Sequence, residues 1–518
     1  MSLLNRLTGV ILIFCLPLAK GFDVHAQAQQ SDKTDSVGLA YAASLTAHAG
    51  KGDFAPYYIA SNRHGTITQQ AGAQLRFAAW KPLERDKRFS WSAGADFISG
   101  ISTYTDYQRY DASSNQMETN RQRPSSIWLQ QLYAELKWRQ VFLMVGMKEQ
   151  ESALFNNPLG SGDYVESGNA RPIPGLRIGF IDFQNIPFTK GMLQIQGEIA
   201  YGRSTDKDWL KNHYNYYNYF VTADTWYHYK RLYFRTSPEQ NLSVTFGMQA
   251  AAQFKGDIYY YKKGQMTSSK QQKFQLRDLW DMLITKGEDT YYKGNHLGAW
   301  DMKAVYRLRS GSKIAAYFQW PWDDGSGIGK LNGFDGIWGL EWNQSEKGLL
   351  SGAVIEFLTF MNQSGPMHLD PEDSPGSNMP IHTDGSDNYY NNYQYNGYTH
   401  HGMGIGSPFF PSTLYNLDGY MQYVDNRIRG FHTGISGSLS ACLDYRILVS
   451  YREGFGTGYV PRKSPVHDTS AMIETTWQVP HLKGLCVNLQ VGIDRGNLYG
   501  NQYGALLKVM YNGFLTKK

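Results

Sequence analysis

Apolar and polar side chains alternate with a period of two along SIWLQQLYAELKWRQVFLMVGMK, residues 126–148. Every second residue from Trp128 to Trp138 is mostly apolar, while the intervening set contains Glu135 and Lys137. Successive side chains of a strand point to opposite faces, so the pattern predicts a strand with a Trp at each end of its apolar face. At ~3.3 Å per residue and ~40° tilt, the two rings stand about 25 Å apart, as in the apolar band of an outer-membrane barrel. A half-buried strand of a soluble β-sandwich would show the same alternation.

The same alternation recurs along the chain. It is found in the segments 89–97, 193–201, 242–250, 443–452, 485–494 and 503–512. Apolar residues occupy one face of each predicted strand, and polar or small residues occupy most of the other. A repeat of this kind favours a large antiparallel β-structure with one apolar and one wet face.

The links between predicted strands fall into two classes. Short, turn-rich links lie near 81–88, 139–140, 184–190, 237–241, 309–312, 343–348, 441–442 and 480–484. Long polar links lie near 49–67, 104–126, 149–173, 204–225, 256–297, 322–335, 360–426, 453–468 and 495–502. They alternate, which is typical of outer-membrane barrels with short periplasmic turns and long extracellular loops. A soluble sandwich has no reason to sort its loops by length.

The sequence therefore predicts an all-β fold: a transmembrane antiparallel outer-membrane β-barrel of about 18 strands, closed because lipid cannot satisfy an open strand edge. Both termini are expected on the short-turn side. In this barrel Glu135 and Lys137 face a polar lumen, while Trp128 and Trp138 lie at the two membrane interfaces.

The N-terminus has the features of a secretory signal peptide. Arg6 precedes the apolar stretch 10–18, and small residues follow at the positions a signal peptidase requires. We expect residues 1–26 to be a signal peptide and residues 27–518 to form the barrel in the cell outer membrane. The apolar stretch is shorter than the ~20 residues of a spanning helix, although a membrane anchor remains the alternative.

Composition and charge narrow the function. Loss of residues 1–26 changes the formal net charge from +5 to +4, and so small a positive charge does not indicate binding of nucleic acid. The remaining cysteines, Cys442 and Cys486, form no CxxC pair and predict neither a disulfide framework nor a metal site. Aromatic residues make up 14% of the chain, which suits the aromatic girdles of a barrel.

One helix is expected within the long link at 256–297. Apolar residues recur there at three- and four-residue spacing, with Ser268 or Ser269 as a candidate cap and Gly287 as a candidate end; they are Leu276, Leu279, Trp280, Leu283 and Ile284. The helix could plug the barrel mouth, form a surface lid or simply pack within its loop.

No arrangement of residues indicates catalysis or a cofactor. The acidic runs at 323–326 and 370–373 lack the ligand spacing of a calcium loop and are better explained as solvated turns. His400 and His401 are adjacent, so on an extended chain they point to opposite faces and would not chelate one ion. We therefore expect no enzyme activity, no metal and no cofactor.

Residues 387–411, DNYYNNYQYNGYTHHGMGIGSPFFP, interleave tyrosines with asparagines in the longest link. Aromatic faces can stack on sugar rings and amides can hydrogen-bond hydroxyls, so the loop is a candidate polysaccharide-binding site. The candidate residues are Tyr389, Tyr390, Tyr393, Tyr395, Asn391, Asn392 and Asn396. Large amphipathic rings would equally well pack a long loop onto the barrel rim, and the sequence leaves both interpretations open.

Three motifs in this order resemble the capsule assembly Wzi family of outer-membrane proteins. They are SGNARPIPGLRIG (167–179), WDDGSGIGKLNGFDGIWGLEW (322–342) and YNGYTHHGMGIGSPFF (395–410). The resemblance spans nearly the whole mature chain. It implies a barrel that acts as a surface lectin, attaching or organising capsular polysaccharide without enzymatic activity. The chain departs from the characterised member, which has a periplasmic helical plug, because only ~10 polar residues precede its first predicted strand.

The sequence therefore favours an outer-membrane barrel that binds capsular or other surface polysaccharide and takes part in capsule assembly or attachment. The expected partners are that polysaccharide and outer-membrane lipid, with no nucleic acid, and the protein is expected to be a monomer. A diffusion porin or saccharide channel is the alternative, because barrels of 16–18 strands can hold an aqueous channel.

Overall fold

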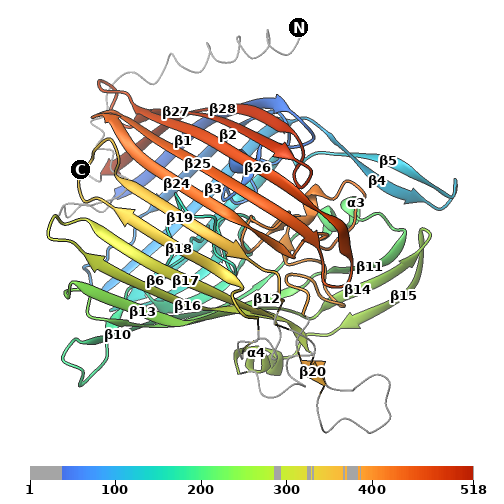
Figure 1. Cartoon of the computed structure of the whole chain (residues 1–518), viewed down its shortest axis with the longest axis horizontal. Helices are drawn as coiled ribbons and strands as arrows, with labels where there is room; N and C mark the ends of the chain where they lie inside the picture. The colour runs from blue at the N-terminus through green and yellow to red at the C-terminus, as the bar shows by residue number, and fades with distance from the viewer. Residues whose placement is uncertain are drawn as a thin grey trace.

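The computed structural model describes residues 38–284, 293–323, 328, 332–363, 365, 368–369, 383–384 and 387–516. Its main sheet closes on itself as an 18-strand antiparallel β-barrel (Figure 1). Strand β1 pairs with β28 along its whole length, from Gly38 opposite Thr516 to Lys51 opposite Tyr503, and this pairing closes the wall. The predicted fold class and strand number are confirmed.

The strands follow one another around the wall in sequence order. Two short segments, β8 and β9, both pair with β10 and together occupy one position. In order, the strands are β1 (Gly38–Lys51), β2 (Gly72–Lys81), β3 (Phe89–Ser102), β6 (Ile127–Trp138), β7 (Val141–Met147), β8 (Gly175–Phe180) with β9 (Gln184–Asn185), β10 (Leu193–Arg203), β12 (Trp226–Thr236), β13 (Leu242–Phe254), β16 (Gly294–Arg307), β17 (Lys313–Asp323), β18 (Gly336–Asn343), β19 (Gly352–Thr359), β24 (Ile428–Ser440), β25 (Leu443–Gly456), β26 (Pro461–Gln478), β27 (Leu485–Gly496) and β28 (Gln502–Thr516).

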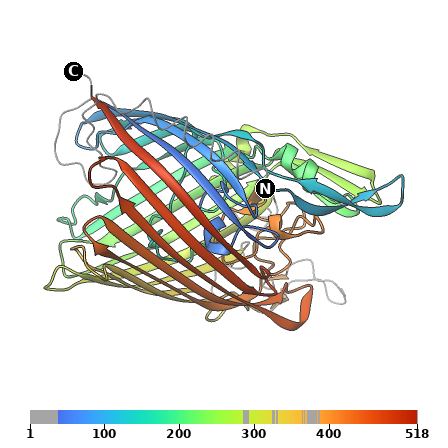
Figure 2. The ribbon, with the colours of Figure 1, turned by 90° about the horizontal axis from the view of Figure 1, so that it is seen from above.

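All eight short links lie at one end of the barrel, as predicted. The first residue of β1, Gly38, and the last residue of β28, Thr516, lie at the same end. At the other end, one predicted long link is wrong: β25 and β26 continue to Gly456 and Pro461, so the connection expected at 453–468 is a tight turn at 457–460. Two further pairings project beyond the wall on one side (Figures 1 and 2). They are the hairpin β4 (Thr105–Asp111) with β5 (Gln116–Gln122), and the small sheet β11 (Asn218–Ala223), β14 (Gly256–Lys262) and β15 (Gln265–Gln272).

Three helices lie in the described long links: α2 (Tyr57–Ala60), α3 (Lys207–His213) and α4 (Leu276–Leu283). The predicted helix is therefore confirmed as α4, but its start was misplaced. Gln275 and Asp278 form a capping box there, whereas Ser268 and Ser269 belong to β15. Gly287 lies outside the described residues. No helix among the described residues is both long enough and apolar enough to cross a membrane.

The alternation of β6 sorts its side chains as expected over its second half. Trp138 and Leu136 are about half exposed on the outer wall, whereas Glu135 and Lys137 are buried inside the barrel. Glu135 accepts a hydrogen bond from Lys148 at 2.7 Å, and the Lys137 ammonium donates to the carbonyl of Lys87.

Trp128 does not lie on the outer wall, which corrects the prediction. The pairing of β6 with β3 shifts between Gln131 and Leu129, because Gln130 is an extra residue in the ladder. A β-bulge of this kind reverses the phase of the alternation beyond it. Leu129 now opposes Phe97 on the outer wall, and Trp128 turns into the barrel mouth.

Side chains from the long links fill the barrel at the long-loop end. The links 52–71, 148–174 and 360–427 contribute the main buried cluster there, together with inward-facing residues of the wall. Tyr164, Tyr390 and Phe410 lie at its centre, with the rings of Tyr164 and Tyr390 stacked at 4.8 Å. The described links of the chain thus pack into the lumen at its long-loop end.

Candidate functional site

An open groove lies at the long-loop end of the barrel and has a volume of about 760 Å³. Its walls are the β4–β5 hairpin, the first residues of β6, helix α3, the link around Arg171, and the turn between β22 (Thr399–His400) and β23 (Met403–Gly404). A volume of this size falls within the ~300–1,000 Å³ of small-molecule sites. It could therefore hold one or a few sugar units of a polymer.

Three partly exposed aromatic rings line this groove. The Trp128 ring lies under the Arg171 guanidinium at 4.6 Å, and the Trp209 ring stacks on His213 at 4.4 Å. Tyr104, which is half exposed, lies under the guanidinium of Arg123 at 4.8 Å. Each ring is held on one side by a packed neighbour and keeps part of its surface for the groove, which is the arrangement that stacking on a flat apolar ligand face requires.

Side-chain amides hold the two walls of the groove together. Asn120 and Gln122 of β5 both donate to the carbonyl of Asn212 in α3, the former at 2.8 Å. The floor contributes two more amides, Gln69 and Gln130, which are buried. Amides donate and accept together, so those at the groove surface suit hydroxyl groups.

Arg171 supplies a positive charge that is not neutralised by an ion pair with any described carboxylate. Burial lowers the pKa of Arg171 to about 10, which leaves the guanidinium charged at neutral pH. Arg121, by contrast, pairs with Asp106 at 2.9 Å on the outer side of the hairpin. Arg171 thus adds one positive charge to the lining of the groove.

His400 and His401 lie at the groove but do not form a metal site. His400 hydrogen-bonds the Arg171 carbonyl through Nδ1 at 2.9 Å, and burial lowers the pKa of both rings below the usual histidine range. The two histidines are therefore neutral at pH 7, and His400 ties the Arg171 link to the β22–β23 turn. No group of three His, Cys, Asp or Glu side chains in the described part of the chain could hold a metal ion.

The tyrosine–asparagine loop is largely internal. Tyr389, Tyr390 and Tyr395 have almost no exposed surface. Their rings therefore offer no free face to a sugar and instead pack the loop into the lumen.

Two of the loop asparagines are likewise buried and act as structural ties. Asn391 exchanges hydrogen bonds with the backbone of Tyr423, and Asn396 does so with the backbone of Thr222. Only Tyr393, 63% exposed, and the half-buried Asn392 present surface among the seven candidates. Neither residue lines the groove, and sugar contact by this loop stays a prediction for these two.

Of the acidic runs, 324–326 and 370–373 lie outside the described residues.

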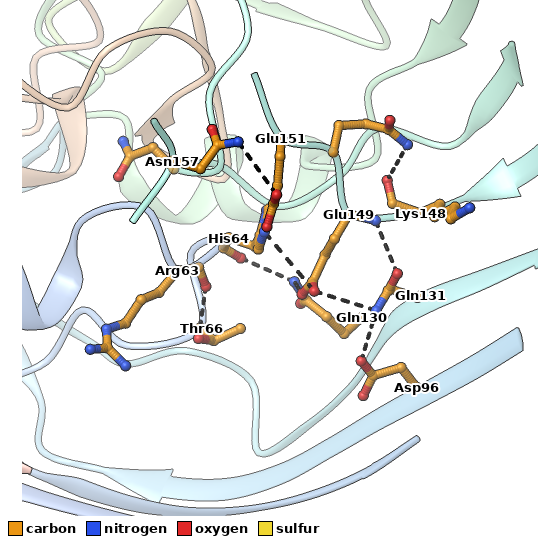
Figure 3. Close-up of polar contacts among 12 residues, drawn as sticks. Arg63, His64, Thr66, Asp96, Gln130, Gln131, Lys148, Glu149, Glu151 and Asn157 are labelled. Carbon is orange, nitrogen blue, oxygen red and sulfur yellow. Dashed lines mark hydrogen bonds and ion pairs between the residues drawn. The ribbon is translucent and has the colours of Figure 1, made fainter. Parts of the chain in front are cut away.

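A charge network beneath the groove fastens the filling loops to the wall. Figure 3 shows the amides of Gln130 and Gln131 beside the Glu149 carboxylate, which accepts a hydrogen bond from Gln130 at 3.0 Å. Arg76 of β2 donates to the same carboxylate at 2.9 Å, and His64 approaches it at 4.0 Å. The bulge in β6 is what turns both glutamines inward, so the feature that exposes Trp128 to the groove also anchors the link at 148–174.

Sequence reasoning singled out two groove segments without assigning them a site. Arg171 lies in the first of the three motifs and His400 in the third, and the fold brings the two motifs together. The aromatic residues of the groove were missed. Trp128 was assigned to the wrong face, and Trp209 had no signal beyond its place in a polar link.

The fold resembles that of solved outer-membrane barrels. Wzi of Escherichia coli, described as an outer-membrane protein involved in group 1 capsule assembly and a carbohydrate-binding β-barrel, aligns with 90% of this chain and 83% of its own, with a TM-score of 0.54 and 11% identity. Acinetobacter baumannii OccAB2 covers 92% of this chain and 98% of its own at 9% identity, with a TM-score of 0.47. Pseudomonas aeruginosa OccK5 (OpdH) gives the same coverage at 10% identity, with a TM-score of 0.43.

At these identities the likeness shows the fold alone, that of an outer-membrane β-barrel. No protein-family model and no curated protein sequence matches the chain. The comparison thus supports a likeness to Wzi in fold only, and the resemblance of the three motifs stays a prediction.

Proposed function

We propose that this outer-membrane barrel binds a surface polysaccharide in the groove at its long-loop end and takes part in the assembly or attachment of a capsule or related polymer. In this proposal residues 1–26 are a cleaved signal peptide and residues 27–518 form the barrel. The protein sits in outer-membrane lipid as a monomer, with its long loops facing the cell exterior.

The groove is the observation that carries the proposal. It combines the partly free faces of Trp128, Trp209 and Tyr104 with amides and with Arg171, which forms no ion pair with a described carboxylate. Aromatic faces suit the apolar faces of pyranose rings, and amides suit their hydroxyls. The carbohydrate binding described for Wzi, whose fold this chain shares, supports the same assignment.

The test is retention of polymer on the surface of a deletion strain complemented with groove variants. Trp128→Ala and Trp209→Ala together should release polysaccharide into the medium while the barrel still inserts at normal levels. Trp477→Ala is the matched control, because that ring is 43% exposed on the outer wall, away from the groove. Normal retention by the double variant would remove the groove from the proposal.

The tyrosine–asparagine loop is tested by a separate variant in the same retention assay. Tyr393→Ala removes the one candidate ring with substantial exposed surface and leaves the packed tyrosines intact. Loss of retention in this variant would extend the binding surface to the loop, and unchanged retention would leave the loop with a packing role only.

The channel alternative draws on the free space at the short-turn end. Two cavities there have volumes of about 430 and 390 Å³, one of them lined by Glu135. The long-loop half is filled by packed side chains, which argues against an open path. Single-channel recording in planar bilayers decides the matter: steady nanosiemens-scale steps would favour a porin, and closed traces together with impaired polymer retention would favour the binding function.

A further inference from the structure

A second chamber lies inside the barrel and shares no lining residue with the groove. It has a volume of about 340 Å³ and lies between strands β25 to β28 and the links 52–71 and 148–174. It reaches Cys486, one residue from the start of β27 at the short-turn end. The chamber is thus placed to receive a ligand from the side opposite the groove.

The charged side chains lining this chamber do not balance. Arg63, Arg446 and Lys508 are cationic, and Glu474 is the one acidic residue among the lining residues. Glu474 is already paired with Arg446, which donates from Nε at 2.6 Å. Its other oxygen accepts hydrogen bonds from the amides of Asn488 and Gln490, at 2.6 and 3.2 Å. The lining therefore sets the single negative charge of Glu474 against three positive charges.

Neither Arg63 nor Lys508 forms an ion pair with a described carboxylate, although Glu474 lies close enough to Arg63 to act on its charge. Arg63 donates to the amide oxygen of Gln490, while its buried Nε has no hydrogen-bond partner among the described residues. Figure 3 shows the Arg63 side chain turned away from the Glu149 network. Lys508 stands opposite Thr46 on one side and Asn488 on the other, and none of the described hydrogen bonds or ion pairs involves its ammonium.

Two cations that share one partly open space without an ion pair repel each other, and a bound anion would relieve this repulsion because a partly buried charge gains from a partner. Carboxylate and phosphate groups match the fork of an arginine and the point charge of a lysine. The surrounding hydroxyls and amides, including those of Ser61, Asn157 and Thr476, suit a polyhydroxylated ligand.

We propose that this chamber binds a small anion between Arg63 and Lys508, a carboxylated monosaccharide or a phosphate being the class of ligand it fits. The chamber volume lies at the lower end of the ~300–1,000 Å³ of small-molecule sites, so one monosaccharide fits and a polymer does not. The proposal is independent of polysaccharide binding in the groove, since neither cation lines that site.

Isothermal titration calorimetry on the detergent-purified full chain tests the proposal, with D-glucuronate, inorganic phosphate and D-glucose as probes. At least one anion should give saturable heat, and neutral D-glucose should give none at this site. Lys508→Met and Arg63→Met should each weaken the affinity for the anion at least about tenfold, as expected for loss of one charge-assisted contact. Binding of glucuronate alone assigns a carboxylate ligand, and binding of phosphate alone assigns a phosphate.

Two control variants show where in the protein the anion binds. Lys262→Met removes the charge of an exposed residue at the end of β14, and Arg171→Met removes a groove cation that has no ion pair with a described carboxylate; neither should change anion binding. Loss of anion heat in Arg171→Met would place the anion in the groove and overturn the proposal, as would saturable binding that survives in Lys508→Met. Should the lumen variants not fold, the Arg171→Met protein still decides, because its anion binding must persist and must weaken when salt rises from about 50 to about 500 mM; no binding in that protein would overturn the proposal.

Discussion

Glu198 joins two arginines of the lumen wall, and its substitution gives the sharpest test of how the filling loops are held. Its carboxylate in β10 accepts hydrogen bonds from Arg177 of β8 and, at 3.1 Å, from Arg231 of β12. Arg177 in turn donates to Glu166 of the filling link 148–174 at 2.8 Å. Two cations and two carboxylates thus form one chain from the wall to the loop. Glu198→Gln keeps the side-chain shape and removes one of the two negative charges.

The expected cost follows from burial. The side chains of Arg177, Glu198 and Arg231 are only 9%, 5% and 13% exposed, so solvent screens them little. Removing one partner of a buried ion pair costs about 3–5 kcal/mol, because an uncompensated charge stays behind. The glutamine oxygen can still accept one hydrogen bond, which places the loss of unfolding free energy at about 3 kcal/mol.

Urea unfolding in detergent micelles, followed by tryptophan fluorescence, measures this loss as a shift of the midpoint at constant slope. Glu239→Gln is the control, because Glu239 lies exposed in the short turn after β12 and should change the midpoint little. Adding Arg231→Met to Glu198→Gln should recover part of the loss, since the unpaired cation is then gone. A cost below about 1 kcal/mol for Glu198→Gln, the value of an exposed pair, would refute the reasoning.

Two further predictions concern the groove wall. Burial lowers the pKa of His213 from 6.5 to about 3, because the folded protein disfavours the charged ring. The contribution of His213 to stability is therefore complete above pH 6.5 and is lost as the pH falls from 6.5 toward 3. Protease cleavage within α3 should increase over that range, and the increase should be less steep in His213→Phe than in the wild type. Gly402 has a φ of +77°, and an added Cβ would lie 2.4 Å from Cζ2 of Trp209. Gly402→Ala should therefore displace that ring and weaken polysaccharide retention, whereas Gly458→Ala, with no atom within 4 Å, should not; equal retention in the two strains would contradict the role of the ring.

Much of the wall could be predicted because its signal is local. Alternation with period two, short turn-rich links and long polar links are properties of neighbouring residues, and they predicted the fold class, the strand number and the lumenal positions of Glu135 and Lys137. The prediction of a long link at 453–468 was wrong for a related reason. Its polar residues read as a loop, although β25 and β26 extend there as paired strands beyond the apolar part of the wall.

The candidate site could be predicted only in part. The interleaved tyrosines and asparagines suit sugar binding and packing alike, and the choice depends on what surrounds them. Tyr390 donates its hydroxyl to the Tyr164 carbonyl and lies within a buried cluster whose members come from distant links. Burial of this kind is set by long-range packing, which composition does not encode.

By itself the sequence determined a barrel, its strand count and the side on which its long links gather, because closure in lipid leaves few other ways to satisfy an alternating chain. The tertiary structure alone decided the groove. One extra residue at Gln130 reverses the face of Trp128, and this reversal is defined only by the register against β3. The other groove walls, at Arg171, Trp209 and His400, meet only because closure of the wall brings separate links to one mouth.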